Sequence, residues 1–204
     1  MHIAVAGNIG AGKTTLTGLL AKHFKWEPHY EDVVDNPYLD DFYHQMERWS
    51  FNLQIYFLNS RFNQILQIRE SGKNIIQDRT IYEDSHIFAP NLHAMGLMTN
   101  RDFNNYKSLF ELMEGFVAAP DLLIYLRSSI PNLVKQIHSR GREYENSISI
   151  DYLSRLNERY EAWIQGYDKG KLLILDVDKL DFVGNPEDLG TIINKIDAEL
   201  NGLF

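Results

Sequence analysis

Cysteine is absent from this sequence, which excludes disulfide cross-links within the chain. Long apolar runs are absent too, since none approaches the roughly 20 residues that a membrane-spanning helix needs. The first residues lack the charged and apolar stretches of a signal peptide. With no sign of secretion, we expect a cytoplasmic protein without a membrane partner.

Basic residues are in the minority. Lys and Arg together number 20 against 28 Asp and Glu, which gives a formal net charge of −8. A polyanion usually binds to a clustered basic surface. The acidic balance therefore argues against a nucleic-acid partner.

No Gly/Ser-rich linker, internal repeat or low-complexity stretch interrupts the 204 residues. This length suffices for one domain with a good core, so we expect a single domain over 1–204. Apolar stretches of strand length alternate with helical patterns, at residues 3–6, 28–31, 74–78, 121–126 and 171–176. The alternation predicts an α/β fold, with about five parallel strands and helices on both faces of the sheet.

The most informative motif lies between the first predicted strand and a predicted helix over 15–24. Residues 7–14 read Gly-Asn-Ile-Gly-Ala-Gly-Lys-Thr, which is the G-x-x-x-x-G-K-T pattern of a P-loop. The free N–H groups of a helix N-terminus attract phosphate, Lys13 can reach the β- and γ-phosphates, and Thr14 can bind magnesium. We therefore expect ATP to contact Gly7, Asn8, Ile9, Gly10, Ala11, Gly12, Lys13, Thr14 and Thr15.

Charged residues mark the ends of the next two predicted strands. Glu31 ends the second, and Asp78 with Arg79 ends the third. In a parallel sheet these ends share the edge at which ligands bind. The acid can take a proton from an acceptor hydroxyl or hold magnesium, and the arginine can orient the transferred phosphoryl group. A plain ion pair between Glu31 and Arg79 is the alternative.

Two other segments contain suggestive motifs. Arg140-Gly141-Arg142 between two helices indicates a lid over about 140–146 that closes on phosphates, although Gly141 can simply cap a helix. The segment 194–197 spells N-K-x-D, the guanine-reading motif of GTPases. Its apolar neighbours form a helical stripe, so we expect no guanine site there.

The predicted helix over 47–69 carries apolar residues nearly all round. Such a helix is a plain core helix, or it also meets a second subunit. Gln54 and Arg61 lie two turns apart and share a face. If buried, they need either an internal acid or a polar ligand as partner.

Together these segments resemble the deoxyribonucleoside kinase family, and the resemblance covers almost the whole chain. It rests on the P-loop, the Glu31 segment, Glu47 to Phe51 with Gln54 and Arg61, residues 78–84, and Arg140 to Arg142. The short lid and the Asp-Asn-Pro-Tyr-Leu segment at 35–39 are most similar to bacterial deoxyadenosine and deoxyguanosine kinases. The resemblance implies a P-loop kinase fold and ATP- and Mg²⁺-dependent phosphorylation of a deoxyribonucleoside 5′-hydroxyl in nucleotide salvage.

The resemblance also implies roles for single residues. Glu31 is the base, Arg79 braces it, and Asp78 lies near magnesium with Thr14. The nucleobase edge is read by Gln54, Arg61 and Asp84, and the sugar 3′-hydroxyl is held by Tyr43 and Glu145. The apolar walls of the nucleoside pocket are Ile9, Val33, Leu39, Leu53 and Phe88. Catalysis also uses Lys13, Arg140 and Arg142, and the donor base lies near Asp181 and Phe182.

The charged pair of Arg61 and Asp84 disfavours the methyl group of thymine, so we expect deoxyadenosine to be preferred, followed by deoxyguanosine and deoxycytidine. Phe57 is bulkier than the small residue of some members and leaves the choice of base open. The alternatives are a nucleoside monophosphate kinase similar to thymidylate kinase, a polynucleotide 5′-kinase, and a non-enzymatic NTP-binding switch. The resemblance and the apolar helix both favour a homodimer.

Overall fold

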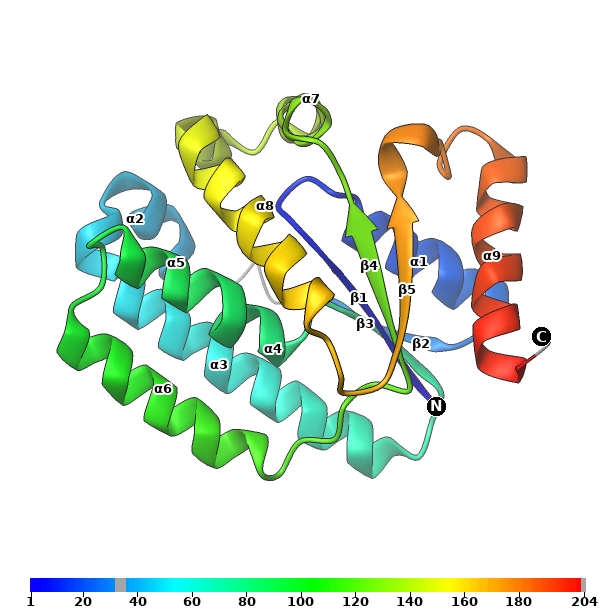
Figure 1. Ribbon diagram of the computed structural model, residues 1–204, viewed down its shortest axis with the longest axis horizontal. Helices are drawn as coiled ribbons and strands as arrows, with labels where there is room; N and C mark the ends of the chain where they lie inside the picture. The colour runs from blue at the N-terminus through cyan, green and yellow to red at the C-terminus, as the bar shows by residue number, and fades with distance from the viewer. Residues whose placement is uncertain (32–35, 203–204) are drawn as a thin grey trace.

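The computed structural model describes residues 1–31 and 36–202, and Figure 1 shows their arrangement. Five parallel strands form one sheet in the order β2-β3-β1-β4-β5. The strands are β1 (His2–Gly7), β2 (Glu27–His29), β3 (Ile75–Asp78), β4 (Leu122–Arg127) and β5 (Lys171–Asp176). The prediction of a five-stranded parallel sheet is confirmed.

Helices connect the strands and cover both faces of the sheet (Figure 1). The α-helices are α1 (Lys13–Phe24), α2 (Leu39–His44), α3 (Met46–Ser71), α4 (Ile81–Glu83), α5 (Ala89–Ala94), α6 (Asn100–Glu114), α7 (Ile130–Arg140), α8 (Ile150–Gln165) and α9 (Pro186–Asn201). A π-helix, η1 (Asp84–Phe88), follows α4, and two 3-10 helices, η2 (Glu143–Ser147) and η3 (Val177–Lys179), follow α7 and β5. No helix in the described part of the chain is long and apolar enough to cross a membrane.

Strands β1 and β4 are apolar on both sides because each side packs on helices. Along β1, Ala4 and Ala6 join a core layer with α3, α5, α6 and α8, whereas Ile3 and Val5 join the layer under α1, α7 and α9. All four residues are fully buried. This double coverage explains why the strands lack polar alternation.

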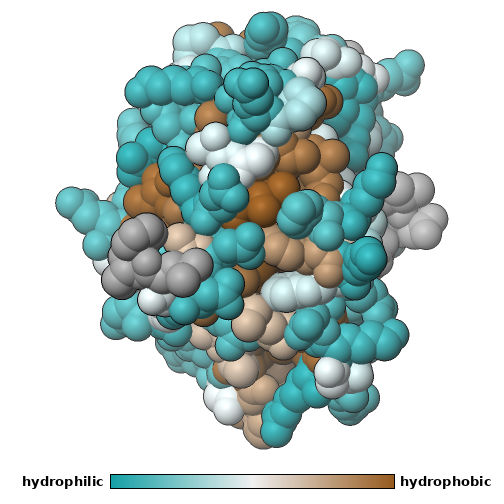
Figure 2. All heavy atoms as spheres, turned by 90° about the vertical axis from the view of Figure 1, so that its right-hand side faces the viewer, coloured by the Kyte–Doolittle hydropathy of each residue, from teal (hydrophilic) through white to brown (hydrophobic). Residues whose placement is uncertain are grey.

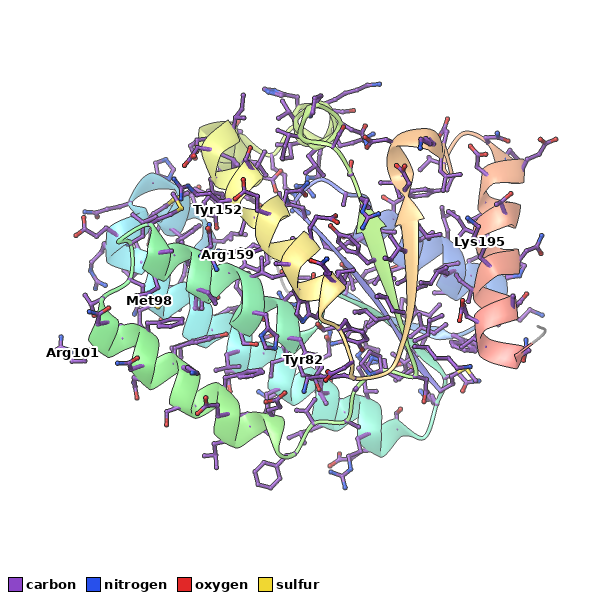
Figure 3. All side chains as sticks on the ribbon, in the orientation of Figure 1. Tyr82, Met98, Arg101, Tyr152, Arg159 and Lys195 are labelled. Carbon is purple, nitrogen blue, oxygen red and sulfur yellow. The ribbon has the colours of Figure 1, made fainter. Side chains whose placement is uncertain are left out.

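The core layer under α1, α7 and α9 reaches the surface at its border. Figure 2, which faces the α9 side, shows hydrophobic residues in the middle of this face with hydrophilic ones around them. Half-buried Leu189 and Leu200 of α9 pack against this layer. The segment 194–197 lies inside α9, as expected, and Figure 3 shows its Lys195 on α9, away from Tyr152 of α8.

The second strand differs from the prediction. It pairs with β3 over only three residues, Glu27 to His29, and ends there. Glu31 therefore follows the strand in a loop instead of ending it. The last paired residue of β2, His29, lies opposite Gln77, one residue before β3 ends at Asp78.

Helix α3 contains the predicted segment but is not buried all round. Its core side includes the buried Leu53, Phe57 and Ile65, while Phe51 and Phe62 are only half-buried. Phe51 and Phe62 thus leave part of the apolar surface of α3 accessible.

Two helix ends give a test of backbone strain. Lys25 caps α1 with a φ of 58°, and Gly72 caps α3 with a φ of 62°. This left-handed conformation is costly for a side chain but free for glycine. We expect Lys25→Gly to raise the free energy of unfolding by about 0.5–1 kcal/mol in urea titrations.

The matched control is Gly72→Ala, since a Cβ at Gly72 would meet nothing within 4 Å. It should lower the free energy of unfolding by about 1 kcal/mol through strain alone. A loss of stability in Lys25→Gly would show that the α1 cap is held by something other than backbone conformation.

Candidate active site

A cavity of about 340 Å³ opens at the carboxyl edge of the sheet, beside the P-loop. That volume lies within the usual range for a small-molecule site. Most residues predicted from the sequence line it: Ile9, Gly10, Lys13, Thr14, Glu31, Leu39, Tyr43, Leu53, Gln54, Arg61, Arg79, Asp84, Phe88, Arg140, Arg142 and Glu145. Val33, which we expected in its apolar wall, lies outside the described residues.

The P-loop runs from the end of β1 into α1, which begins at Lys13. Lys13 Nζ donates to the Asn8 carbonyl oxygen at 2.9 Å. The buried Asn8 side chain donates in turn to the Leu153 carbonyl oxygen and to Asn157 Oδ1, both at 3.1 Å. Helix α8 therefore anchors the loop from outside the motif.

Gly10 shows why the loop needs glycine. Its φ is 86°, and a Cβ there would lie 2.8 Å from the Leu133 carbonyl oxygen and 2.9 Å from Ile137 Cγ1. Both neighbours belong to α7, so the loop passes directly against that helix. A side chain at this position would have to displace α7 backbone.

Arg61 joins two acids at the centre of the cavity. Its Nη2 donates to Glu31 Oε1 at 2.6 Å, and its Nε donates to Asp84 Oδ2. Arg61 and Asp84 are almost completely buried, so the two acids compensate a desolvated cation. The internal acid that the sequence offered as one alternative for Arg61 is thus present, and Arg61 still faces the cavity.

Arg79 approaches Glu31 from the other side. Its Nε lies 3.3 Å from Glu31 Oε1, an ion pair without the geometry of a hydrogen bond. The guanidinium also stands over the Phe88 ring, 4.6 Å from its centroid. Glu31 therefore lies between two arginines at the cavity wall.

Gln54 offers hydrogen-bonding capacity to a ligand. Its side chain is buried and lines the cavity, and its Oε1 has no hydrogen-bond partner among the described residues. A buried polar atom without a partner is costly. A ligand that donates a hydrogen bond at this point would relieve that cost.

The π-helix η1 brings two further residues to the cavity. A capping box of Thr80 and Glu83 begins α4, and the chain then widens into η1. Asp84 and Phe88, at its two ends, both line the cavity. π-helical turns are frequent at functional sites, and nothing in the sequence pattern indicated this one.

Thr14 and Asp78 have the oxygen atoms that magnesium requires. Thr14 Oγ1 donates to Asp78 Oδ2 at 2.5 Å, and the buried Asp78 Oδ1 has no hydrogen-bond partner within 1–31 and 36–202. The described residues contain no group of three or more His, Cys, Asp and Glu side chains that could hold a metal. Magnesium on one or two protein oxygens, completed by phosphates and water, fits this donor set.

The predicted lid is held together by Glu145. Arg140 donates to both Glu145 oxygens, at 3.0 and 2.5 Å, and Arg142 lies 3.5 Å from Oε1. Gly141, with a φ of 68°, caps α7, so the helix-cap interpretation of the Arg-Gly-Arg segment is confirmed, and the lid stays a prediction. Tyr144 stacks on Tyr43 of α2 with ring centroids 5.5 Å apart.

Some expected residues are not brought to the cavity. Phe182 packs on the P-loop instead, where a Cβ at Gly12 would lie 3.0 Å from its ring. Asp181 is exposed and accepts from the Gly184 N–H. Phe182 therefore lies beside the P-loop, outside the cavity lining.

Other residues line the cavity without having been assigned to it from the sequence: Tyr30, Phe42, Phe57, Tyr144 and Tyr152. Their aromatic side chains are typical of core residues, and Phe57 differs in the sequence only as bulkier than the small residue of some family members. Tyr152 reaches the cavity from α8 (Figure 3). Its helical spacing alone gave no signal of this.

The charges of the site shift its pKa values strongly. Burial opposes the ionisation of Glu31, but Arg79, Arg61 and Lys13 outweigh it and lower its pKa to about 2. Burial raises the pKa of Asp84 to about 6 against the pull of Arg61. Burial and the neighbouring Arg79 lower the pKa of Lys13 to about 8.

The low pKa of Glu31 predicts how stability depends on pH. Its ionised form stabilises the fold fully above its ordinary pKa of 4.5, and this contribution is lost as the pH falls toward 2. We expect Glu31→Gln to lower the free energy of unfolding by about 2 kcal/mol at pH 6. The cost at pH 3 should be clearly smaller in urea titrations, and an equal cost at both pH values would contradict the shift.

This chain is similar in sequence to a family model and to several known proteins. The family model described as deoxynucleoside kinase matches residues 3–201. The deoxyadenosine/deoxycytidine kinase of Bacillus subtilis (strain 168) is 43% identical over 197 residues, covering 95% of this chain and 90% of the relative. The deoxyadenosine kinase of Dictyostelium discoideum is 41% identical over 192 residues, covering 94% and 77%.

A solved structure supports the fold independently. The deoxyadenosine kinase from M. mycoides, with the products dCMP and a flexible dCDP bound, has a TM-score of 0.87 and 31% identity. The match covers 97% of this chain and 100% of that one. By its sequence over 3–201 and by its fold, this chain belongs to the deoxynucleoside kinase family.

Proposed function

We propose that this protein transfers the γ-phosphoryl group of ATP to the 5′-hydroxyl of a deoxyribonucleoside, with deoxyadenosine preferred. The observation that carries the proposal is the position of Glu31. It lies between Arg61 and Arg79 in a cavity that also contains Lys13 and Thr14 of the P-loop. One site thus combines a phosphate-binding end with an acid for an acceptor hydroxyl.

Glu31 orients the acceptor and receives its proton. A carboxylate with a pKa of about 2 is ionised at neutral pH and accepts a hydrogen bond from the 5′-hydroxyl. Phosphoryl transfer needs mainly positioning and charge stabilisation, so the proton can leave as the oxygen bonds to phosphorus. Lys13, Arg79, Arg140 and Arg142 supply positive charge to the phosphates.

Gln54 and Asp84 suit bases that carry an exocyclic amine. Adenine and cytosine present a ring nitrogen acceptor beside an amine donor, which matches the donor and acceptor of a glutamine amide. The Asp84 carboxylate accepts from the amine, whereas thymine would place a carbonyl there. The similarity to relatives named deoxyadenosine/deoxycytidine kinase and deoxyadenosine kinase supports this preference.

Tyr43 and Glu145 hold the sugar 3′-hydroxyl in this proposal. Both line the cavity, and Glu145 is already fixed by the two lid arginines. Substrate contact with Glu145 therefore links the sugar to the residues that close over the phosphates. Asp181 and Phe182 lie on the donor side, outside the cavity lining.

Thr14 and Asp78 would hold Mg²⁺ together with the triphosphate. Asp78 Oδ1, which has no hydrogen-bond partner in the described part of the chain, is the oxygen available for it. When bound, the ion neutralises charge on the β- and γ-phosphates. Thr14 Oγ1 would then exchange its contact with Asp78 for one with the metal.

A second copy of the chain would cover the apolar surface of α3 and α6. Leu112 at the end of α6 is 66% exposed, Phe116 just beyond it is 59% exposed, and Phe51 and Phe62 of α3 are half-buried. Helices α3 and α6 pack side by side. The mass of the protein in solution tests the proposed homodimer. The proposed location of the protein is the cytoplasm.

An ADP-release assay with ATP and a panel of acceptors tests the function. We expect activity with deoxyadenosine and weaker activity with deoxycytidine and deoxyguanosine. Activity only with nucleoside monophosphates would support the thymidylate kinase alternative. ADP release without any acceptor would instead favour the NTP-binding switch.

The role of Glu31 predicts the effect of one substitution. Glu31→Gln should lower turnover by at least about a hundredfold, as the loss of a general base does. ATP affinity should stay nearly unchanged, because the P-loop is intact. Near-normal turnover measured with saturating nucleoside would reject Glu31 as the base.

Base choice should depend on Arg61 and Asp84 together. Replacing both by apolar residues, as in Arg61→Met with Asp84→Leu, removes both charges of this pair, and Glu31 keeps its ion pair with Arg79. We expect the ratio of kcat/KM values to shift toward thymidine. The control replaces Arg127 and Glu161, an ion pair that does not line the cavity, and should leave the substrate ranking unchanged. An unchanged ranking in the Arg61/Asp84 variant would show that Arg61 and Asp84 do not read the base.

A further inference from the structure

Arg79 has an unusual backbone for a buried residue. Its φ is 67°, and Lys25 at an exposed helix end is the other described residue apart from glycine with a positive φ. A side chain in the left-handed region is strained and persists where its surroundings hold it. The surroundings of Arg79 therefore show what fixes this arginine in the site.

The back of the guanidinium is held by Tyr160 and Glu83. Arg79 Nη1 donates to the Tyr160 hydroxyl at 2.7 Å, and that hydroxyl donates to Glu83 Oε1 at 2.8 Å. Nη1 itself lies 3.5 Å from Glu83 Oε1. The Tyr160 hydroxyl has a single proton, and the guanidinium can only donate. The hydroxyl therefore accepts from Arg79 and donates its proton to Glu83.

Glu83 also ties this group to the P-loop. Its Oε1 accepts from the Gly7 N–H at 3.3 Å, and its Oε2 accepts from the Thr80 N–H at 2.7 Å. The side chains of Glu83 and Tyr160 are completely buried. One carboxylate thus joins the first glycine of the phosphate-binding loop to the arginine on the acceptor side.

We propose that Glu83 and Tyr160 are positioning residues that hold the Arg79 guanidinium between Glu31 and the transferred phosphoryl group. This inference rests on the proposed phosphoryl transfer. Neither residue lines the cavity, so they act through Arg79 and the loop. Misplacing a catalytic group by about 1 Å can cost on the order of a hundredfold in rate.

Tyr160→Phe tests the inference because it removes only the hydroxyl. The matched control is Tyr125→Phe, whose ring stacks on Tyr160 at 5.8 Å and whose hydroxyl donates to Glu161 Oε1 at 2.9 Å. We expect kcat to fall by about tenfold or more in Tyr160→Phe, with both KM values within about twofold. Tyr125→Phe should keep kcat within about twofold.

A double-mutant cycle with Arg79→Lys identifies the residue through which Tyr160 acts. If the hydroxyl works by holding the guanidinium, Tyr160→Phe should cause little further loss of kcat in the Arg79→Lys background. Multiplicative losses in the double variant would overturn the inference. So would a Tyr160→Phe enzyme whose thermal stability falls while its kcat matches that of Tyr125→Phe.

Failure of the proposed function would look different. In that case the unmodified protein would phosphorylate no nucleoside at all, before any variant is compared. An active unmodified enzyme with a fully active Tyr160→Phe variant would reject only the positioning role. Glu83→Gln gives a second variant, since its amide replaces one accepting oxygen by a donor, and its kcat should fall at least as far as that of Tyr160→Phe.

Discussion

The site depends on charge balance in a buried space. Lys13, Arg61 and Arg79 are almost completely removed from water at one edge of the sheet, as are Asp78 and Asp84, and Glu31 beside them is 18% exposed. Isolated charges there would cost many kcal/mol, so each must have partners of opposite sign. The parallel strands bring these groups together because their carboxyl ends meet at one edge. The parallel sheet therefore determines which charged residues meet, and their opposite charges allow them to be buried there.

Much of this arrangement could be predicted from the sequence. The P-loop motif fixed the strand, loop and helix over 2–24, and the strand pattern indicated the sheet. Arg61 and Asp84 were expected to pair, and they do. Such predictions succeed where neighbouring residues determine the structure, as in the P-loop. They also succeed where the spacing of apolar residues matches either a helix or a strand but not both.

The rest depended on contacts between distant segments. The end of β2 is set by pairing with β3, which left Glu31 in a loop. The π-helical turn at Asp84, the left-handed Arg79 and the role of Tyr160 arise from packing between β3, η1 and α8. Tyr152 and Phe57 are indistinguishable in sequence from core aromatics. Glu83 is the residue of this group that the sequence marks, because it is a second acid next to Asp84.

The contact of Gly10 with α7 links the P-loop to the helix that leads into the proposed lid. The atoms that a side chain at this position would strike, the Leu133 carbonyl oxygen and Ile137, belong to the helix that ends at Arg140. Because Gly10 lacks a side chain, the P-loop can lie directly against this helix. Enlarging the residue would displace the loop and α7 together, so the phosphate-binding loop cannot be altered here without moving the base of the proposed lid.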